Sequence, residues 1–65
     1  MFIKVTALDV GQANLNFSEV FLFGKGPNDR GTMIQFKDGT FLTIEESVEE
    51  IQAILLSMNP NQLND

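Results

Sequence analysis

The residues of this chain that are best suited to binding chemistry lie in one glycine-rich loop, KGPNDRG, at positions 25 to 31. Lys25 and Arg30 bring two of the four basic side chains of the sequence into this loop, and Asn28 adds a side-chain amide. Cations and free backbone N–H groups in one loop can form a concave site for phosphate or carboxylate. If the loop binds a ligand, we expect Lys25, Asn28 and Arg30 to hold a phosphate-bearing small molecule, such as a nucleotide signal.

A second interpretation of the loop is an ordinary connection between strands, whose charges aid solubility. The phosphate-loop motif G-x-x-x-x-G-K-[ST] does not occur in the sequence, and no helix is expected directly after the loop. The concentration of cations in an otherwise acidic chain would suit a phage protein that sequesters a nucleotide signal of the host defence.

The six phenylalanines are the second group of residues whose positions need an explanation. If the aliphatic side chains of each strand face the helix, the alternation of side chains places Phe17, Phe21, Phe23 and Phe41 on the opposite face of the sheet. Monomers rarely expose an apolar patch of that size. We therefore predict that these four side chains form an interface between copies of the chain. Two alternatives stay open: the sheet curls into a small barrel around them, or a bulge near Gly24 reverses the alternation.

Catalytic and metal-binding chemistry finds little support in the residue types. The sequence has no cysteine and no histidine, which removes disulfides and the usual zinc and haem ligands. No base is evident beside a serine or threonine that could act as a nucleophile. Glu45, Glu46, Glu49 and Glu50 cluster where a helix is expected to begin, and there they complement the helix dipole. We expect neither a cofactor nor a metal, and no enzymatic activity.

Length and charge narrow the class of protein further. A chain of 65 residues forms one domain and buries only about 60% of its unfolded surface, so oligomerisation is an expected source of stability. The net charge of −5 disfavours binding to nucleic acid or to an anionic membrane. No apolar run is long enough to span a membrane, and the start lacks the pattern of a signal peptide. We expect a cytoplasmic protein, in a bacterium or in the host of a phage.

Short β-rich segments must position these residues. We predict strands at 2–8, about 16–23, 33–37 and 40–44, with loops at 9–14 and 24–31. The pair Asp38-Gly39 predicts a two-residue type I′ turn between the last two strands.

A helix is predicted to follow the last strand. Ser47 and Glu50 have the spacing of a capping box, and apolar residues then recur at helical spacing. Pro60 should end the helix near residue 58 or 59. The prediction is a single domain at 1–59 and a loose tail at 60–65. Its fold class is α+β: a four-stranded antiparallel sheet, open or barrel-like, with one C-terminal helix in the order β-β-β-β-α.

The sequence resembles a family of short bacterial proteins. The segments that carry the resemblance are I-K-V-T-x-L at 3–8, L-N at 15–16, the D-G hairpin at 38–39 and E-S-V-E-E-I at 46–51. They resemble the FlbD-type small proteins of flagella and swarming motility and related short bacterial and phage proteins. The sequence departs from that pattern at Phe17, where the family has proline, and in its longer loop at 24–31. The resemblance implies a non-enzymatic accessory role and carries no catalytic residues.

Two functional hypotheses result. The first is a small, non-enzymatic, homo-oligomeric interaction module, encoded by a bacterium or a phage, whose partner is itself or another protein. The second is a binder of a phosphate-bearing small molecule through the loop between Lys25 and Arg30.

Overall fold

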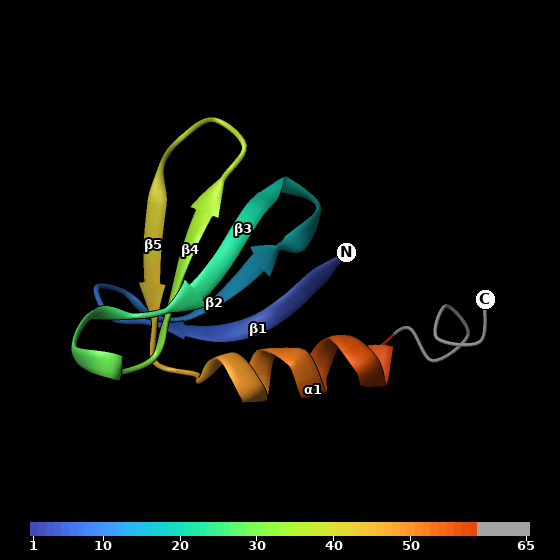
Figure 1. Ribbon diagram of the computed structural model, residues 1–65. Coiled ribbons are helices and arrows are strands. Elements are labelled where there is room, and N and C mark those ends of the chain that lie inside the picture. Colours follow the sequence, from blue (N-terminus) through green and yellow to red (C-terminus); the bar gives the residue numbers. More distant parts are fainter. Residues whose placement is uncertain (59–65) are drawn as a thin grey trace.

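The computed structural model describes residues 1–58, so the predicted tail at 60–65 and the last residue of the predicted domain lie outside the described residues. Figure 1 shows an α+β fold with a C-terminal helix. Its elements in chain order are β1 (Phe2–Ala7), β2 (Gly11–Asn16), the 3-10 helix η1 (Phe17–Glu19), β3 (Val20–Lys25), the 3-10 helix η2 (Pro27–Asp29), β4 (Thr32–Phe36), β5 (Phe41–Ile44) and α1 (Val48–Met58).

The sheet has five antiparallel strands in the order β2-β1-β5-β4-β3 and is open between β2 and β3. The predicted α+β class, with an antiparallel sheet and one C-terminal helix, is confirmed, whereas the strand number of four and the barrel alternative are wrong. The missed strand is β2, part of which was predicted to be a loop. Its sequence GQANLN has a low β propensity, but it pairs along its whole length with β1, from Phe2 opposite Asn16 to Ala7 opposite Gly11. Pairing and burial of Leu15 outweigh local preference here.

The segment predicted as one strand from 16 to 23 is interrupted. The Asn16 side chain accepts a hydrogen bond of 3.2 Å from the backbone N–H of Ser18, which caps η1 and ends β2. β3 begins only at Val20, and its pairing with β4 shifts between Val20 and Leu22, where a β-bulge adds Phe21.

This bulge reverses the predicted alternation. Phe23 pairs with the buried Ile34 and packs against the core, and its ring meets that of Phe17 edge to face with centroids 5.4 Å apart. The assignment of Phe17 and Phe23 to the face opposite the helix is therefore wrong. Phe21 and Phe41 are exposed as predicted, with 67% and 58% of their surface accessible.

The hairpin of β4 and β5 is confirmed in its position, but its turn differs from the prediction. The Phe36 N–H donates to the Thr40 carbonyl at 2.8 Å, which leaves a three-residue loop. Only Gly39 in this loop has a positive φ, of 94°, so the turn is not type I′. The Asp38 carboxylate instead accepts from the N–H and hydroxyl of Thr40 at 2.9 and 2.7 Å, and these bonds lower the pKa of Asp38.

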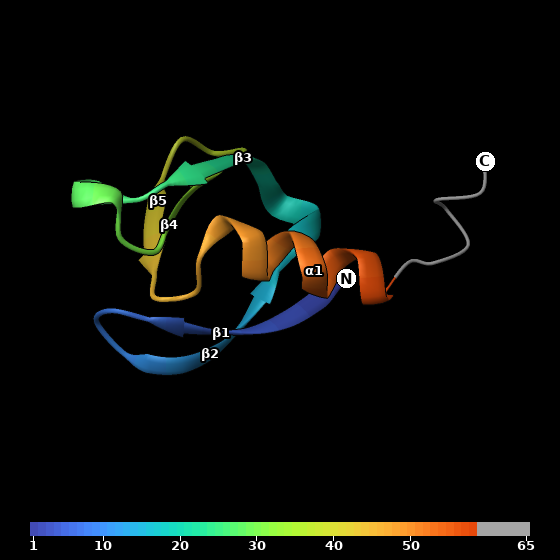
Figure 2. The same ribbon diagram turned by 60° about the horizontal axis from the view of Figure 1, so that its bottom comes forward.

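Helix α1 lies between the two halves of the bent sheet, with β1 and β2 on one side and β3 to β5 on the other (Figure 2). The halves meet where Ala7 pairs with Ile44, the single residue pair between β1 and β5. Ile51 projects from α1 into the core and is fully buried there. The other buried members of this core cluster are Ile3, Val5, Leu15, Ile34 and Ile44. No helix within residues 1–58 is long and apolar enough to cross a membrane.

The capping box is confirmed. The Glu50 N–H donates to the Ser47 hydroxyl at 3.1 Å, and the Ser47 N–H donates to the Glu50 carboxylate at 2.8 Å. The helix begins at Val48 and reaches Met58, as predicted.

Replacing Ser47 by alanine removes the acceptor of the Glu50 N–H and should lower the free energy of unfolding by about 1 kcal/mol. Urea unfolding followed by circular dichroism measures the change. Ser57→Ala, at an exposed position near the end of α1, is the matched control and should change little. Equal midpoints for the two variants would contradict the capping role.

Candidate functional site

The outer face of β3, β4 and β5 carries a patch of exposed apolar side chains. Residues that pair across neighbouring strands point to the same face, and Leu22, Gln35 and Phe41 form one such row. The next row contains Met33 and Thr43. Leu8 continues this row beside Thr43, because the Leu8 N–H donates a hydrogen bond of 3.2 Å to the Thr43 carbonyl. We call the apolar side chains of these rows, with Phe21 in the bulge beside Leu22, the outer patch: Leu8, Phe21, Leu22 and Phe41, which are exposed, and Met33, which is half-buried.

No ionised side chain interrupts this face of the three strands. The paired residues that β3, β4 and β5 present there are Leu22, Gly24, Met33, Gln35, Phe41 and Thr43, and the exposed Phe21 lies in the bulge next to Leu22. This is unexpected in a chain with nine acidic and four basic residues. Loss of charge at the centre of a surface, with aromatic side chains retained, is the compositional sign of a protein interface.

The loop between β3 and β4 is folded by backbone geometry. The Gly26 N–H donates to the Gly31 carbonyl at 3.2 Å, and the Arg30 N–H donates to the Pro27 carbonyl at 3.1 Å. Asn28 and Asp29 both adopt left-handed conformations, with φ of 59° and 58°. Asparagine and aspartate tolerate that region better than other residues with a side chain. The sequence PND therefore makes a tight turn that holds Arg30 in a defined position.

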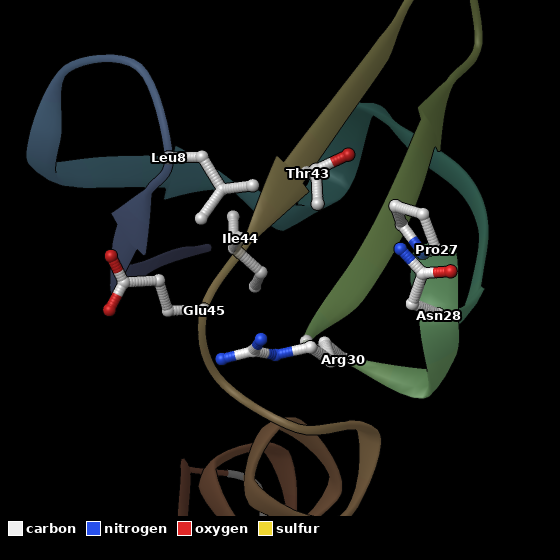
Figure 3. A pocket seen from close by; sticks show the side chains of 8 residues that line it. Leu8, Pro27, Asn28, Arg30, Thr43, Ile44 and Glu45 are labelled. Carbon is white, nitrogen blue, oxygen red and sulfur yellow. The ribbon is translucent and has the colours of Figure 1, made fainter.

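A hollow of about 590 Å³ lies between this loop and the junction of β1 with β5 (Figure 3). It adjoins the outer patch because Leu8 belongs to both. Asn28 and Arg30 line the hollow, as two members of the predicted ligand-binding set. The third member, Lys25, is not among the lining residues; it ends β3, opposite Thr32. The complete lining is Leu8, Pro27, Asn28, Arg30, Gly31, Thr43, Ile44 and Glu45.

The hollow carries one charge of each sign. The Arg30 side chain extends toward the segment after β5 that carries Glu45, and the Glu45 carboxylate points away from it on the far side of that segment (Figure 3). Both residues are exposed, so each charge remains available to a ligand. Sequence reasoning missed Glu45 as a member of the site, because it was grouped with the acidic cluster at the start of the helix. No pattern in the sequence indicates this position, because the order of the strands brings the end of β5 beside the loop.

Glu46, the neighbour of Glu45, fixes the segment between β5 and α1. Its carboxylate accepts from the N–H and the hydroxyl of Thr6 at 2.8 and 2.9 Å, and its backbone carbonyl accepts from the buried Thr32 hydroxyl at 2.7 Å. Partial burial acts to raise the pKa of Glu46, but the hydrogen bonds from Thr6 and from its own N–H outweigh it, and the pKa is lowered. Glu46 thus serves the fold and holds Glu45 at the rim of the hollow.

Among residues 1–58, no three acidic side chains converge in a way that could hold a metal ion. No protein-family model, curated protein or solved structure gives a significant match to this chain. The resemblance to FlbD-type proteins stays a prediction, and the geometry described above is the basis for a functional proposal.

Proposed function

We propose that this protein is a small, non-enzymatic, homo-oligomeric interaction module, and that two copies meet through the outer patch. The observation that carries the proposal is the uncharged apolar face of β3, β4 and β5 on a chain of net charge −5. A two-fold interface brings the same surface together from both subunits. Like charges on a face would repel each other when two copies meet through it, and this uncharged face avoids that repulsion.

The size of a standard interface sets how much surface a second copy must cover. An interface of standard size takes about 800 Å² from each partner. That is roughly a sixth of the 4579 Å² that the protein exposes. Three strands lying about 4.8 Å apart provide the centre of such a surface, with Leu8 and Phe21 at its margins.

The exposed aromatic residues suit packing of one sheet on another. Two sheets pack about 10 Å apart, with the side chains of their facing surfaces interdigitating. Phe21 and Phe41 stand on β3 and β5, the outer strands of this face, with 67% and 58% of their surface accessible. A role as an accessory protein of a bacterium or a phage agrees with the resemblance to FlbD-type proteins.

The mass in solution tests this proposal. We expect light scattering behind size-exclusion chromatography to give at least two chains of 7.3 kDa for the wild type. Phe41→Asp replaces an apolar contact worth about 1.5–3 kcal/mol by a charge that is desolvated twice in a two-fold interface. The dimer should therefore dissociate at least tenfold more readily, and the mass should fall toward one chain.

Phe2→Asp is the matched control. Phe2 is 61% exposed, like Phe41, but it lies on β1 beyond the junction with β5 and outside the outer patch. Its substitution should leave the mass unchanged. A wild type that stays monomeric at millimolar concentration, or a Phe2 variant that dissociates as fully as the Phe41 variant, would refute the proposed interface.

A further inference from the structure

The hollow beside the outer patch has the size of a ligand site. Its volume of about 590 Å³ lies within the range of roughly 300–1,000 Å³ that small-molecule sites have. Apolar surface comes from Leu8 and Pro27, and polar groups come from the Asn28 amide and the Thr43 hydroxyl. Such a combination of apolar walls and a few polar groups is typical of a binding site for an organic molecule.

The charges of the hollow favour a ligand with two ends of opposite sign. Arg30 offers a planar guanidinium that binds a carboxylate through paired hydrogen bonds. Glu45 offers a carboxylate that accepts from an ammonium group. Both residues line the hollow and both side chains are exposed, so both charges can act on one molecule.

We propose that this hollow binds a zwitterionic short peptide with apolar side chains. Its carboxylate pairs with Arg30, its ammonium group pairs with Glu45, and its side chains lie against Leu8 and Pro27. The volume exceeds what one amino acid fills, so a dipeptide is the smallest expected ligand. This inference goes beyond the proposed self-association and needs no second copy, although both use the exposed side chain of Leu8.

A phosphate-bearing ligand fits the same charges less well. The second cation of the predicted anion site, Lys25, does not line the hollow, and Glu45 repels an anion placed there. The negative net charge of −5 adds to that repulsion. An ammonium group on the ligand, by contrast, is attracted by Glu45.

Titration of ¹⁵N-labelled protein with L-leucyl-L-leucine tests the proposal by two-dimensional NMR. We expect saturable shifts of the Gly31, Thr43 and Glu45 amides at ligand concentrations of about 1–10 mM, as for a weak ligand held by two charged ends. N-acetyl-leucyl-leucine lacks the ammonium group and leucyl-leucinamide lacks the carboxylate. Each should bind about tenfold more weakly, because one charge-assisted contact is lost.

Charge-neutral variants connect these losses to the two side chains. Arg30→Gln and Glu45→Gln should each weaken binding of leucyl-leucine about tenfold. Their matched controls are Lys25→Gln and Glu49→Gln, which make the same charge changes at exposed positions outside the hollow. A dispersed amide spectrum shows that each variant is folded.

Three results would overturn the proposal. The first is the absence of saturable shifts with leucyl-leucine at about 10 mM, and the second is equal binding of the acetylated or amidated dipeptide. The third is tighter binding of inorganic phosphate than of leucyl-leucine, with a further gain in Glu45→Gln, which would identify an anion site instead.

Discussion

Replacing Gly31 by alanine should lower the free energy of unfolding by about 2–4 kcal/mol, because both the backbone and the available space require glycine here. Gly31 has a φ of 68°, and a Cβ atom at this position would lie 2.1 Å from the carbonyl oxygen of Ile44. That oxygen belongs to the backbone of a fully buried residue, so the loop must move away from β5. A protein of this length has a total stability of about 3–10 kcal/mol, and the loss is a large part of it.

Substitutions at two other glycines separate backbone strain from the steric contact with Ile44 as causes of this loss of stability. Gly39 has a φ of 94° but open space around its Cβ position, so Gly39→Ala measures backbone strain alone. Gly24 has neither a positive φ nor a close neighbour, so Gly24→Ala should cost least. Urea unfolding of the three variants at one protein concentration should rank them Gly24, Gly39, Gly31 in order of increasing loss. A Gly31 variant as stable as the Gly39 variant would show that the contact with Ile44 has no energetic weight.

Gly31→Ala should also weaken ligand binding in the hollow. Gly31 lines it between Arg30 and the backbone of Ile44, and displacement of the loop separates Arg30 from Glu45. If the Gly31 variant remains folded, we expect its affinity for leucyl-leucine to fall, whereas Gly39→Ala should retain it.

The parts of the fold that the sequence predicted well depend on neighbours in the chain. Ser47 and Glu50 are three residues apart, and their reciprocal hydrogen bonds need no other element. The hairpin around Asp38 and Gly39 was likewise located correctly. Its turn type was not, because the Asp38 carboxylate binds the Thr40 N–H and thereby stabilises a different loop.

The parts that the sequence did not predict depend on distant contacts. β2 is a strand because β1 lies beside it, and the bulge that turns Phe23 inward depends on the register between β3 and β4. The hollow likewise combines Leu8, Arg30 and Glu45 from three separate segments. A single sequence places Arg30 in a loop, but only the sheet order brings Glu45 across from it.

Replacing Glu46 by glutamine is the second change with a large expected effect, a loss of about 1–3 kcal/mol near neutral pH. The carboxylate accepts two hydrogen bonds from Thr6, and 40 residues separate the two partners in the chain. Glutamine has a single acceptor oxygen, so one Thr6 donor loses its partner or meets the amide nitrogen instead. Glu45→Gln is the control at the adjacent position, where the side chain is exposed, and it should change stability little.

The pH dependence of the unfolding free energy distinguishes the contribution of the Glu46 charge from that of its packing. Because hydrogen bonding lowers the folded-state pKa of Glu46 below its ordinary value of 4.5, its contribution to stability is fully present above that ordinary value. It is lost as the pH falls through the folded-state pKa. The difference in unfolding free energy between wild type and Glu46→Gln should therefore be largest near neutral pH and shrink in acid, as urea unfolding across this range can measure. If the difference instead stays constant into acid, Glu46 acts through packing alone. The hydrogen bonds between Thr6 and Glu46 would then contribute equally whether or not Glu46 is ionised.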